Sequence, residues 1–286
     1  MSVLFTDSNC ELSYKTIKEY GINLIKMPYT LDNEEYYYDD GEDESFTIIY
    51  KRMKEGAMPI TSALSPQNYV DYFEPFLSKG EDILYVAFSN QLSGTFNYMQ
   101  MALDELKEKY PERTVTVFNT RSISFGGGIQ VLHAAKLKKA GKTDKEIIKE
   151  LEILRDKVRV FFYVDSLTYL KRGGRVSSAS AVFGNMLNIK PILKVDEEGK
   201  IVKTNTVHGQ KKALSLLAET FLNEAQLTNE FTYYIIDADA EAEANALEAD
   251  ILNKSNNSVK FEKYKIGPVI TTHCGPGTVG IIYVAK

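Results

Sequence analysis

Short apolar runs alternate along the chain with longer segments in which apolar residues recur at helical spacing. In the first half the apolar runs predict buried strands at 2–8, 22–31, 82–89 and 114–120. Segments with helical spacing follow most of these runs, and they predict helices within 46–80, 92–110, 121–141 and 143–158. Alternation of strand and helix in this order favours a mostly parallel sheet covered by helices.

The helix expected after Leu64 shows how sharply some boundaries are marked. Ser65 suits an N-cap, and Pro66 suits the first helical position. Elsewhere the boundaries are less clear. The acidic, tyrosine-rich segment 32–45 is interpreted as a solvated loop, because it lacks the spaced oxygen ligands and glycine turn of a calcium loop.

The pattern changes near residue 160, where a second domain is expected to begin. Two apolar strands flank Glu-Glu-Gly within 188–207, which indicates a hairpin. Further strands are expected at 159–166, 231–239, 259–267 and 280–286, and helices at 210–225 and 241–255. Between the last two strands, the segment 267–280 is interpreted as a Gly/Pro loop that carries His273 and Cys274.

Composition and charge exclude several classes of protein. The 286 residues carry a net charge of −5, which argues against nucleic acid as a partner. No apolar run is long enough to predict a membrane span, and the first residues do not resemble a secretion signal. The only two cysteines, Cys10 and Cys274, stand far apart, so a disulfide framework or structural zinc site is not expected and a cytoplasmic location fits.

Three polar loops follow apolar segments and offer hydroxyl groups or glycines. They span Thr61–Pro66, Phe88–Phe96 and Asn119–Gly128. In open α/β sheets, ligands bind where strands end and helices begin. Ser93, Gly94 and Thr95 stand at such a helix start, whose free N–H groups favour an anion, and the hydroxyls of Thr61 and Ser62 add donors. The loops therefore predict an anion-binding crevice.

Each of these loops also has a purely structural interpretation. Ser93 could simply cap its helix, and Thr61 with Ser62 could simply form a turn. The glycines 126–128 lack the lysine of a phosphate-binding loop, and close packing of helix against sheet explains them better. The basic turn that contains Lys171, Arg172 and Arg175 is of a kind that is usually solvated.

His273 has no evident metal-binding companions, since His133 and His208 stand on segments without ligand spacing. Pairing of Ser93 with His273 would suit a hydrolase. However, the sequence around Ser93, QLSGT, is not the G-x-S-x-G elbow of such enzymes.

Seven motifs, taken in order, resemble the DegV family, the bacterial fatty acid-binding proteins that serve fatty acid kinases. They read TDSNCEL, TSALSP, LSGTF, NTRSISFGGG, LTYLKRGGRV, GNMLNIKPIL and GPVITTHCGPGTVG, and they cover nearly the whole chain. Each motif is weak by itself, whereas the ordered set is specific.

The resemblance implies an α/β fold of two domains, 1–160 with the mostly parallel sheet and 161–286 with a mixed sheet, and a lipid between them. It implies that Thr61 and Ser93 bind the carboxylate of a long-chain fatty acid such as palmitate or oleate. His273 would stand behind them, and Ser62, Gly94 and Thr95 would complete the shell. Four residues are candidates either for the acyl tunnel or for ordinary core: Phe183, Met186, Leu187 and Ile189.

By the same resemblance, the protein is a carrier without catalytic residues, metal or cofactor, and it presents its fatty acid to a partner fatty acid kinase. This chain departs from some kinase-serving members by having His208 where they carry an arginine, with Lys211 and Lys212 nearby as substitutes. Two alternatives stay open. One is a Ser93/His273 hydrolase of acyl esters or acyl-phosphates, and the other is a sensor of phosphorylated metabolites that uses the glycine-rich loop.

Overall fold

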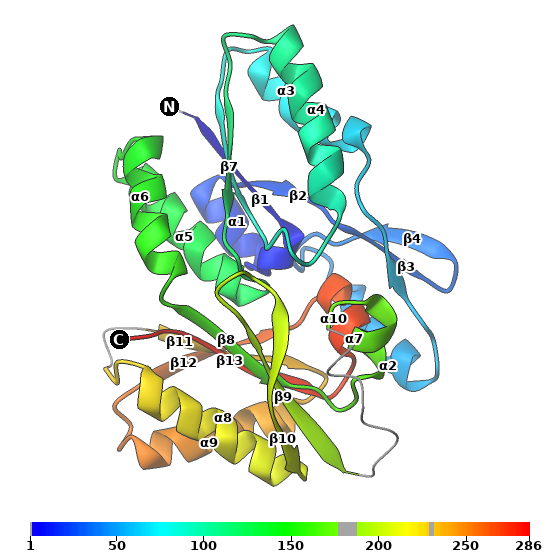
Figure 1. Cartoon of the computed structure of the whole chain (residues 1–286), viewed down its shortest axis with the longest axis vertical. Helices are drawn as coiled ribbons and strands as arrows, with labels where there is room; N and C mark the ends of the chain where they lie inside the picture. Colours follow the sequence, from blue (N-terminus) through cyan, green and yellow to red (C-terminus); the bar gives the residue numbers. More distant parts are fainter. Residues whose placement is uncertain (1, 177–187, 229–231) are drawn as a thin grey trace.

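A parallel sheet of four strands forms the upper part of the molecule in Figure 1. The structure is a computed structural model, and it describes residues 2–176, 188–228 and 232–286. The strand order is β2-β1-β6-β7, and the strands are β1 (Val3–Asp7), β2 (Asn23–Ile25), β6 (Ile83–Ala87) and β7 (Val115–Asn119). Every residue of β6 is buried, because helices cover both faces of the sheet. The predicted parallel sheet is confirmed.

Two groups of helices flank this sheet (Figure 1). One group contains α1 (Tyr14–Tyr20), α5 (Phe125–Lys139) and α6 (Asp144–Arg155), and the other contains α3 (Pro66–Leu77) and α4 (Thr95–Lys109). Ser65 caps α3 by accepting a hydrogen bond from the Asn68 N–H, and Pro66 is the first residue of the helix. The predicted start of α3 is therefore confirmed.

A mixed sheet of six strands forms the lower part, in the order β10-β9-β8-β13-β11-β12. Its strands are β8 (Val158–Tyr163), β9 (Ile189–Val195), β10 (Ile201–His208), β11 (Thr232–Ala238), β12 (Lys260–Lys265) and β13 (Thr278–Val284). The helices α8 (Gln210–Glu224) and α9 (Glu241–Lys254) pack on one face, as Figure 1 shows. Helix α5 contacts β8 and β13 as well as β6, so it joins the two sheets.

Side chains of β8 alternate between two hydrophobic cores. Phe161 and Tyr163 belong to the core beneath α8 and α9. Val160 and Phe162 belong to the larger core, which also contains most of the buried residues of the first half. Because packing is continuous across this strand, the division of the chain after residue 160 stays a prediction about its folding units.

The acidic segment 32–45 is not simply a loop, which corrects the sequence interpretation. Strand β4 (Glu34–Tyr37) pairs with β3 (Pro28–Leu31) as a hairpin, and the short β5 (Ile60–Thr61) pairs on the other side of β3. The turn residues Asp32 and Asn33 both have positive φ, as a tight hairpin requires. All four residues of β4 are exposed. The strand therefore has no buried face, and its sequence lacks the alternation of apolar and polar residues that would predict a strand.

The interpretation of 267–280 as a loop was also wrong, since half of the segment is the helix α10 (Pro268–Cys274). Pro268 occupies the first helical position, where its missing N–H costs nothing. Gly275, with φ of 80°, ends the helix. The remaining helical segments are α2 (Ile48–Lys54), α7 (Thr168–Gly173) and the two 3-10 turns, η1 (Ser8–Cys10) and η2 (Glu44–Thr47). Within the described ranges no helix has the length and apolar character needed to cross a bilayer.

Candidate functional site

A cavity lies where the two large sheets meet α10, and its volume is about 790 Å³ when the part open to solvent is included. Most of its wall is aliphatic or aromatic: Met27, Phe88, Leu92, Ile123, Val160, Phe162, Leu170, Ile201, Ile236, Ile266, Val269 and Ile270. These residues come from both halves of the chain, and they favour a ligand that is largely apolar.

Polar side chains gather on the same cavity. Thr61, Ser62, Ser93 and His273 line it together, although they come from three separate stretches of the sequence. These are four of the six residues expected from the sequence. Asn9, Ser124 and Thr278 contribute further polar groups, and they were not expected.

The other two expected residues, Gly94 and Thr95, do not line this cavity. Thr95 is buried, and its hydroxyl lies 2.9 Å from that of Tyr69. The backbone N–H of Thr95 donates to Ser93 Oγ over 3.2 Å. The first N–H of helix α4 is therefore occupied by a hydrogen bond within the chain. Thr95 holds Ser93 in place and does not face the cavity.

His273 is positioned by groups that hold the start of α10. The side-chain carboxyl group of Glu11 accepts a hydrogen bond from the Gly267 N–H at 2.5 Å. The hydroxyl of Tyr50 donates to the carbonyl of Ile266. A Cβ atom on Gly267 would lie 2.4 Å from the ring of Tyr38, so only glycine allows this close approach. All three partners belong to the first half of the chain.

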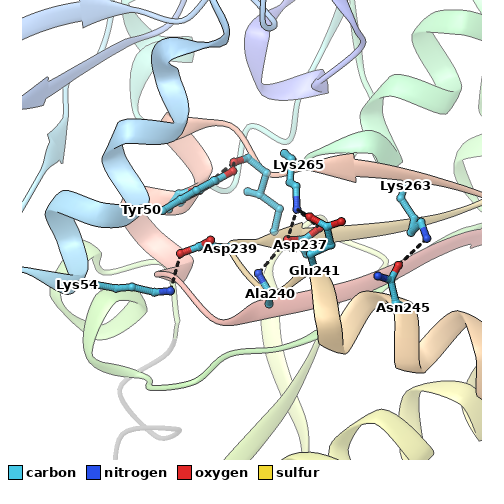
Figure 2. Close-up of polar contacts among 11 residues, drawn as sticks. Tyr50, Lys54, Asp237, Asp239, Ala240, Glu241, Asn245, Lys263 and Lys265 are labelled. Carbon is cyan, nitrogen blue, oxygen red and sulfur yellow. Dashed lines mark hydrogen bonds and ion pairs between the residues drawn. The ribbon is translucent and has the colours of Figure 1, made fainter.

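Figure 2 shows the polar contacts on the neighbouring side of α10. Lys54 from α2 forms an ion pair with Asp239 at 2.5 Å. The buried Asp237 accepts hydrogen bonds from the Ala240 N–H at 2.9 Å and from Lys265 at 3.1 Å. Because Lys54 and Asp239 are exposed, their pair adds little stability. The network does place α2 against the end of β11, beside the helix that carries His273.

His273 and Thr61 form the central polar contact of the cavity. Nε2 of His273 lies 2.9 Å from Oγ1 of Thr61. Burial, together with the positive charges of Arg175 and Arg172, lowers the pKa of His273 to about 4. The imidazole is therefore neutral at pH 7, and only one of its two nitrogens carries a proton.

The surroundings of Nδ1 decide which nitrogen that is. Nδ1 is buried and has no hydrogen-bond partner among the described residues. Either tautomer leaves Nδ1 without a partner, but buried N–H donors are left unpaired more rarely than buried acceptors. We therefore assign the proton to Nε2. In this tautomer the imidazole donates to Thr61 Oγ1, and the Thr61 hydroxyl proton is free to point into the cavity.

Arg175 also lines the cavity and was missed, because its basic turn was expected to be solvated. Gly174 ends α7 with a φ of 68°, and this turn directs Arg175 inward. The half-buried guanidinium donates to the carbonyls of Leu92, at 3.0 Å, and Gly173. Within the described part of the chain no carboxylate forms an ion pair with it, and burial lowers its pKa. A positive charge without a carboxylate partner therefore faces the cavity.

Two of the three glycines 126–128 in α5 are packed closely, as the sequence indicated. A Cβ atom on Gly128 would lie 2.6 Å from the backbone oxygen of Cys10, and one on Gly126 would lie 2.5 Å from Val160. A Cβ on Gly127 would meet only ordinary contacts.

The remaining candidate residues do not belong to the cluster of polar side chains that lines the cavity. Three of the four tunnel candidates, Phe183, Met186 and Leu187, lie outside the described residues, and Ile189 does not line the cavity. His208, Lys211 and Lys212 are exposed at the end of β10 and the start of α8. In the described ranges no three His, Cys, Asp or Glu side chains are arranged to hold a metal.

The comparison with protein families identifies one match. A family model described as "Uncharacterised protein, DegV family" matches residues 2–286. A DegV domain-containing protein of Clostridium perfringens is 36% identical over 282 residues, which cover 99% of this chain and 97% of the relative.

Solved structures of the same family superpose on nearly the whole chain. A DegV family protein from Thermus thermophilus, described as binding fatty acid, has a TM-score of 0.86 at 30% identity, and 99% of each chain is covered. DegV of Bacillus subtilis, described as a fatty acid binding protein, has a TM-score of 0.81 at 30% identity with the same coverage.

Proposed function

This chain belongs to the DegV family, and on that premise we propose that it binds a long-chain fatty acid in the cavity between its two sheets. The acyl chain lies along the apolar wall. The carboxylate lies at the polar group formed by Thr61, Ser62, Ser93, Arg175 and His273. The related structures from Thermus thermophilus and Bacillus subtilis, both described as fatty acid-binding, support this assignment.

One observation carries the proposal: a single cavity combines an extended apolar wall with a cluster of hydrogen-bond donors. A carboxylate moved out of water needs several donors, or its burial is costly. The hydroxyls of Thr61 and Ser93 supply such donors, and Arg175 adds a charge-assisted one. Burial of the acyl chain then stabilises the complex by roughly 0.8 kcal/mol per methylene group.

A titration of the delipidated protein with palmitate and oleate tests the proposal. We expect saturable binding of one fatty acid per chain. Hexadecanol serves as the matched ligand for palmitate, because it keeps an alkyl chain of the same length but lacks the carboxylate. Equal affinity for a fatty acid and the alcohol of the same length would reject the carboxylate assignment.

The hydrolase alternative finds less support in the geometry. His273 makes its hydrogen bond to Thr61, whereas Ser93 Oγ accepts one from the Thr95 N–H. A histidine whose pKa is about 4 is also a weak general base near pH 7. A chromogenic acyl ester tests this alternative, and turnover that disappears in Ser93→Ala would favour it over a carrier.

We propose further that the bound fatty acid is presented, in the cytoplasm, to a separate fatty acid kinase and that the carrier itself uses no cofactor. The exposed residues His208, Lys211 and Lys212 are candidates for kinase contact. Acyl-phosphate formation by a purified bacterial fatty acid kinase tests the partnership. At saturating lipid occupancy we expect His273→Ala to reduce the rate, and a fully active variant would reject a role for the imidazole in presentation.

A further inference from the structure

A second cavity lies on the other side of Val160, which lines both it and the apolar cavity. It is formed by the loop after β7, the end of α6, the start of β8 and the end of β9. Its volume is about 810 Å³ when the part open to solvent is included. Nothing in the proposed lipid function uses it.

Four cationic side chains line this second cavity: Arg121, Arg155, Arg159 and Lys194. Arg155 is the most buried of the three arginines. Its side chain is only 18% exposed, and its guanidinium lies 5.0 Å from the centre of the Phe118 ring. Nη1 of Arg155 donates to the carbonyl of Asn119 at 3.3 Å. Nε is buried and has no hydrogen-bond partner among the described residues.

Carboxylates offset part of this positive charge, since Arg159 forms an ion pair with Glu224 at 3.9 Å. Among the described residues, however, no carboxylate accepts a hydrogen bond from the side chain of Arg121 or Arg155. The nearest to Arg155 Nε is Asp156, at 3.9 Å, which is too long for a hydrogen bond, and its side chain is 73% exposed. Glu197 forms an ion pair with Lys194 at 3.4 Å, and its side chain is 82% exposed. Asp196 accepts hydrogen bonds from the backbone N–H groups of Glu198 and Lys200, and so it is used within the β9–β10 turn.

Backbone contacts fix the position of the Arg121 main chain near Arg155. Arg121 has a φ of 48°, a conformation that is unusual for a residue with a side chain. Its N–H donates to Asn119 Oδ1 at 2.9 Å, and a Cβ on Gly199 would lie 3.0 Å from the Arg121 Cα. The turn between β9 and β10 thus packs closely against the loop that follows β7. Burial lowers the pKa of Arg155, and the positive charge of the neighbouring Arg121 lowers it further.

We propose that this basic cavity binds a small phosphate-bearing anion, either inorganic phosphate or the phosphate of a monoester. Arginine forks match phosphate oxygens with two parallel hydrogen bonds, and a buried unpaired guanidinium N–H is stabilised by such an acceptor. A nucleic acid is a poorer fit, because the chain carries a net charge of −5 and the cations line one confined cavity.

Calorimetric titration of the full-length protein with inorganic phosphate and with glycerol 3-phosphate, at constant ionic strength, tests the proposal. Arg121→Gln and Arg155→Gln should each weaken binding at least about tenfold, because each loses a charge-assisted contact. Lys149→Gln is the matched control, since Lys149 is exposed on α6 outside the cavity. Binding of both ligands would assign the site to phosphate monoesters, and binding of phosphate alone would assign it to the free anion.

No saturable binding of either ligand by the unchanged protein would overturn the proposal. Equal weakening by Lys149→Gln would also overturn it, because the effect would then reflect net charge. Since Arg155 packs on Phe118 and its loss could disturb folding, Arg121→Gln, at an exposed side chain, keeps the test decisive. Fatty acid binding is measured separately, so failure here leaves the lipid function untouched.

Discussion

The hydroxyl of Thr61 lies 2.9 Å from Nε2 of His273, although the two residues are 212 positions apart in the chain. Thr61 ends the edge strand β5, and His273 lies in the last helix, α10. The contact joins the two halves of the molecule at the polar end of an apolar cavity. With its ring N–H on Nε2, His273 leaves the Thr61 hydroxyl proton free to donate, as the proposed carboxylate site requires.

The double variant Thr61→Val with Ser93→Ala should bind fatty acid more weakly while the fold is retained. Each lost hydrogen bond to a carboxylate costs about 1.5–3 kcal/mol, so affinity should fall by at least about a hundredfold. A titration with oleate measures the affinity, and thermal unfolding checks the fold.

Ser65→Ala is the control for that experiment. Ser65 caps α3 and does not line the cavity. Its loss should lower stability by about 1 kcal/mol without changing the affinity for oleate. Unchanged affinity in the double variant would reject the carboxylate site.

Arg175→Met should also weaken fatty acid binding, and the weakening should be largest at low salt, where charge interactions are least screened. Lys171→Met removes the same charge from an exposed position four residues earlier in the same turn region. We expect the Lys171 variant to bind as the unchanged protein does. Comparable losses in the two variants would mean that Arg175 acts only through net charge.

Alanine substitutions at Gly127 and Gly128 test whether the glycine triplet is explained by close packing. Gly128→Ala should destabilise the fold by several kcal/mol, because its Cβ would lie 2.6 Å from a backbone oxygen that has little room to move. Gly127→Ala should be neutral or stabilising by up to about 1 kcal/mol, since alanine favours a helix. Urea unfolding measures both, and equal effects would contradict the packing explanation.

The raised pKa of Glu11 predicts that the protein loses stability as the pH rises toward 8. Burial raises its pKa from 4.5 to about 8. The unfolded chain releases this proton near pH 4.5, whereas the folded chain keeps it until about pH 8. Between these values the unfolded state binds fewer protons, so the free energy of unfolding falls as pH rises, by at most ~1.4 kcal/mol per pH unit.

Two other groups set the pH window in which Glu11 is best observed. His273 has the opposite sign, because its pKa is lowered from 6.5 to about 4, and its contribution to stability rises with pH over that interval. Asp7, whose pKa is raised to about 6, has the same sign as Glu11 but stops contributing near that value.

Above pH 6.5, therefore, Glu11 and the neighbouring Asp40, whose pKa is also raised by burial, dominate. Glu11→Gln should flatten the stability profile of the delipidated protein between pH 6.5 and 8. Parallel profiles for the two proteins, measured by urea unfolding, would contradict this explanation.

The parallel sheet and the capped helix α3 could be predicted from the sequence because local signals determine them. Continuous apolar runs mark strands covered on both faces, and Ser65 with Pro66 marks a helix start. The hairpin β3–β4 was missed because β4 is exposed at every position, although the Asp32-Asn33 turn gave a signal. Helix α10 was missed because flanking glycines and prolines concealed its seven residues, yet Pro268 suits a helix start.

The site was predicted in part, for a related reason. Thr61, Ser62, Ser93 and His273 belong to recognisable sequence motifs, and the fold brings them to one cavity. Arg175 was interpreted as solvated because its inward direction depends on the left-handed turn at Gly174. Thr95 was expected to face the cavity, but its hydroxyl contacts Tyr69, a tertiary contact that no local pattern encodes.

The central claim is that this protein carries a long-chain fatty acid, and organic extraction of the purified protein followed by mass spectrometry tests it most directly. We predict close to one fatty acid per chain, with its length selected by the apolar cavity. Absence of lipid, together with no uptake when palmitate or oleate is offered, would contradict the account.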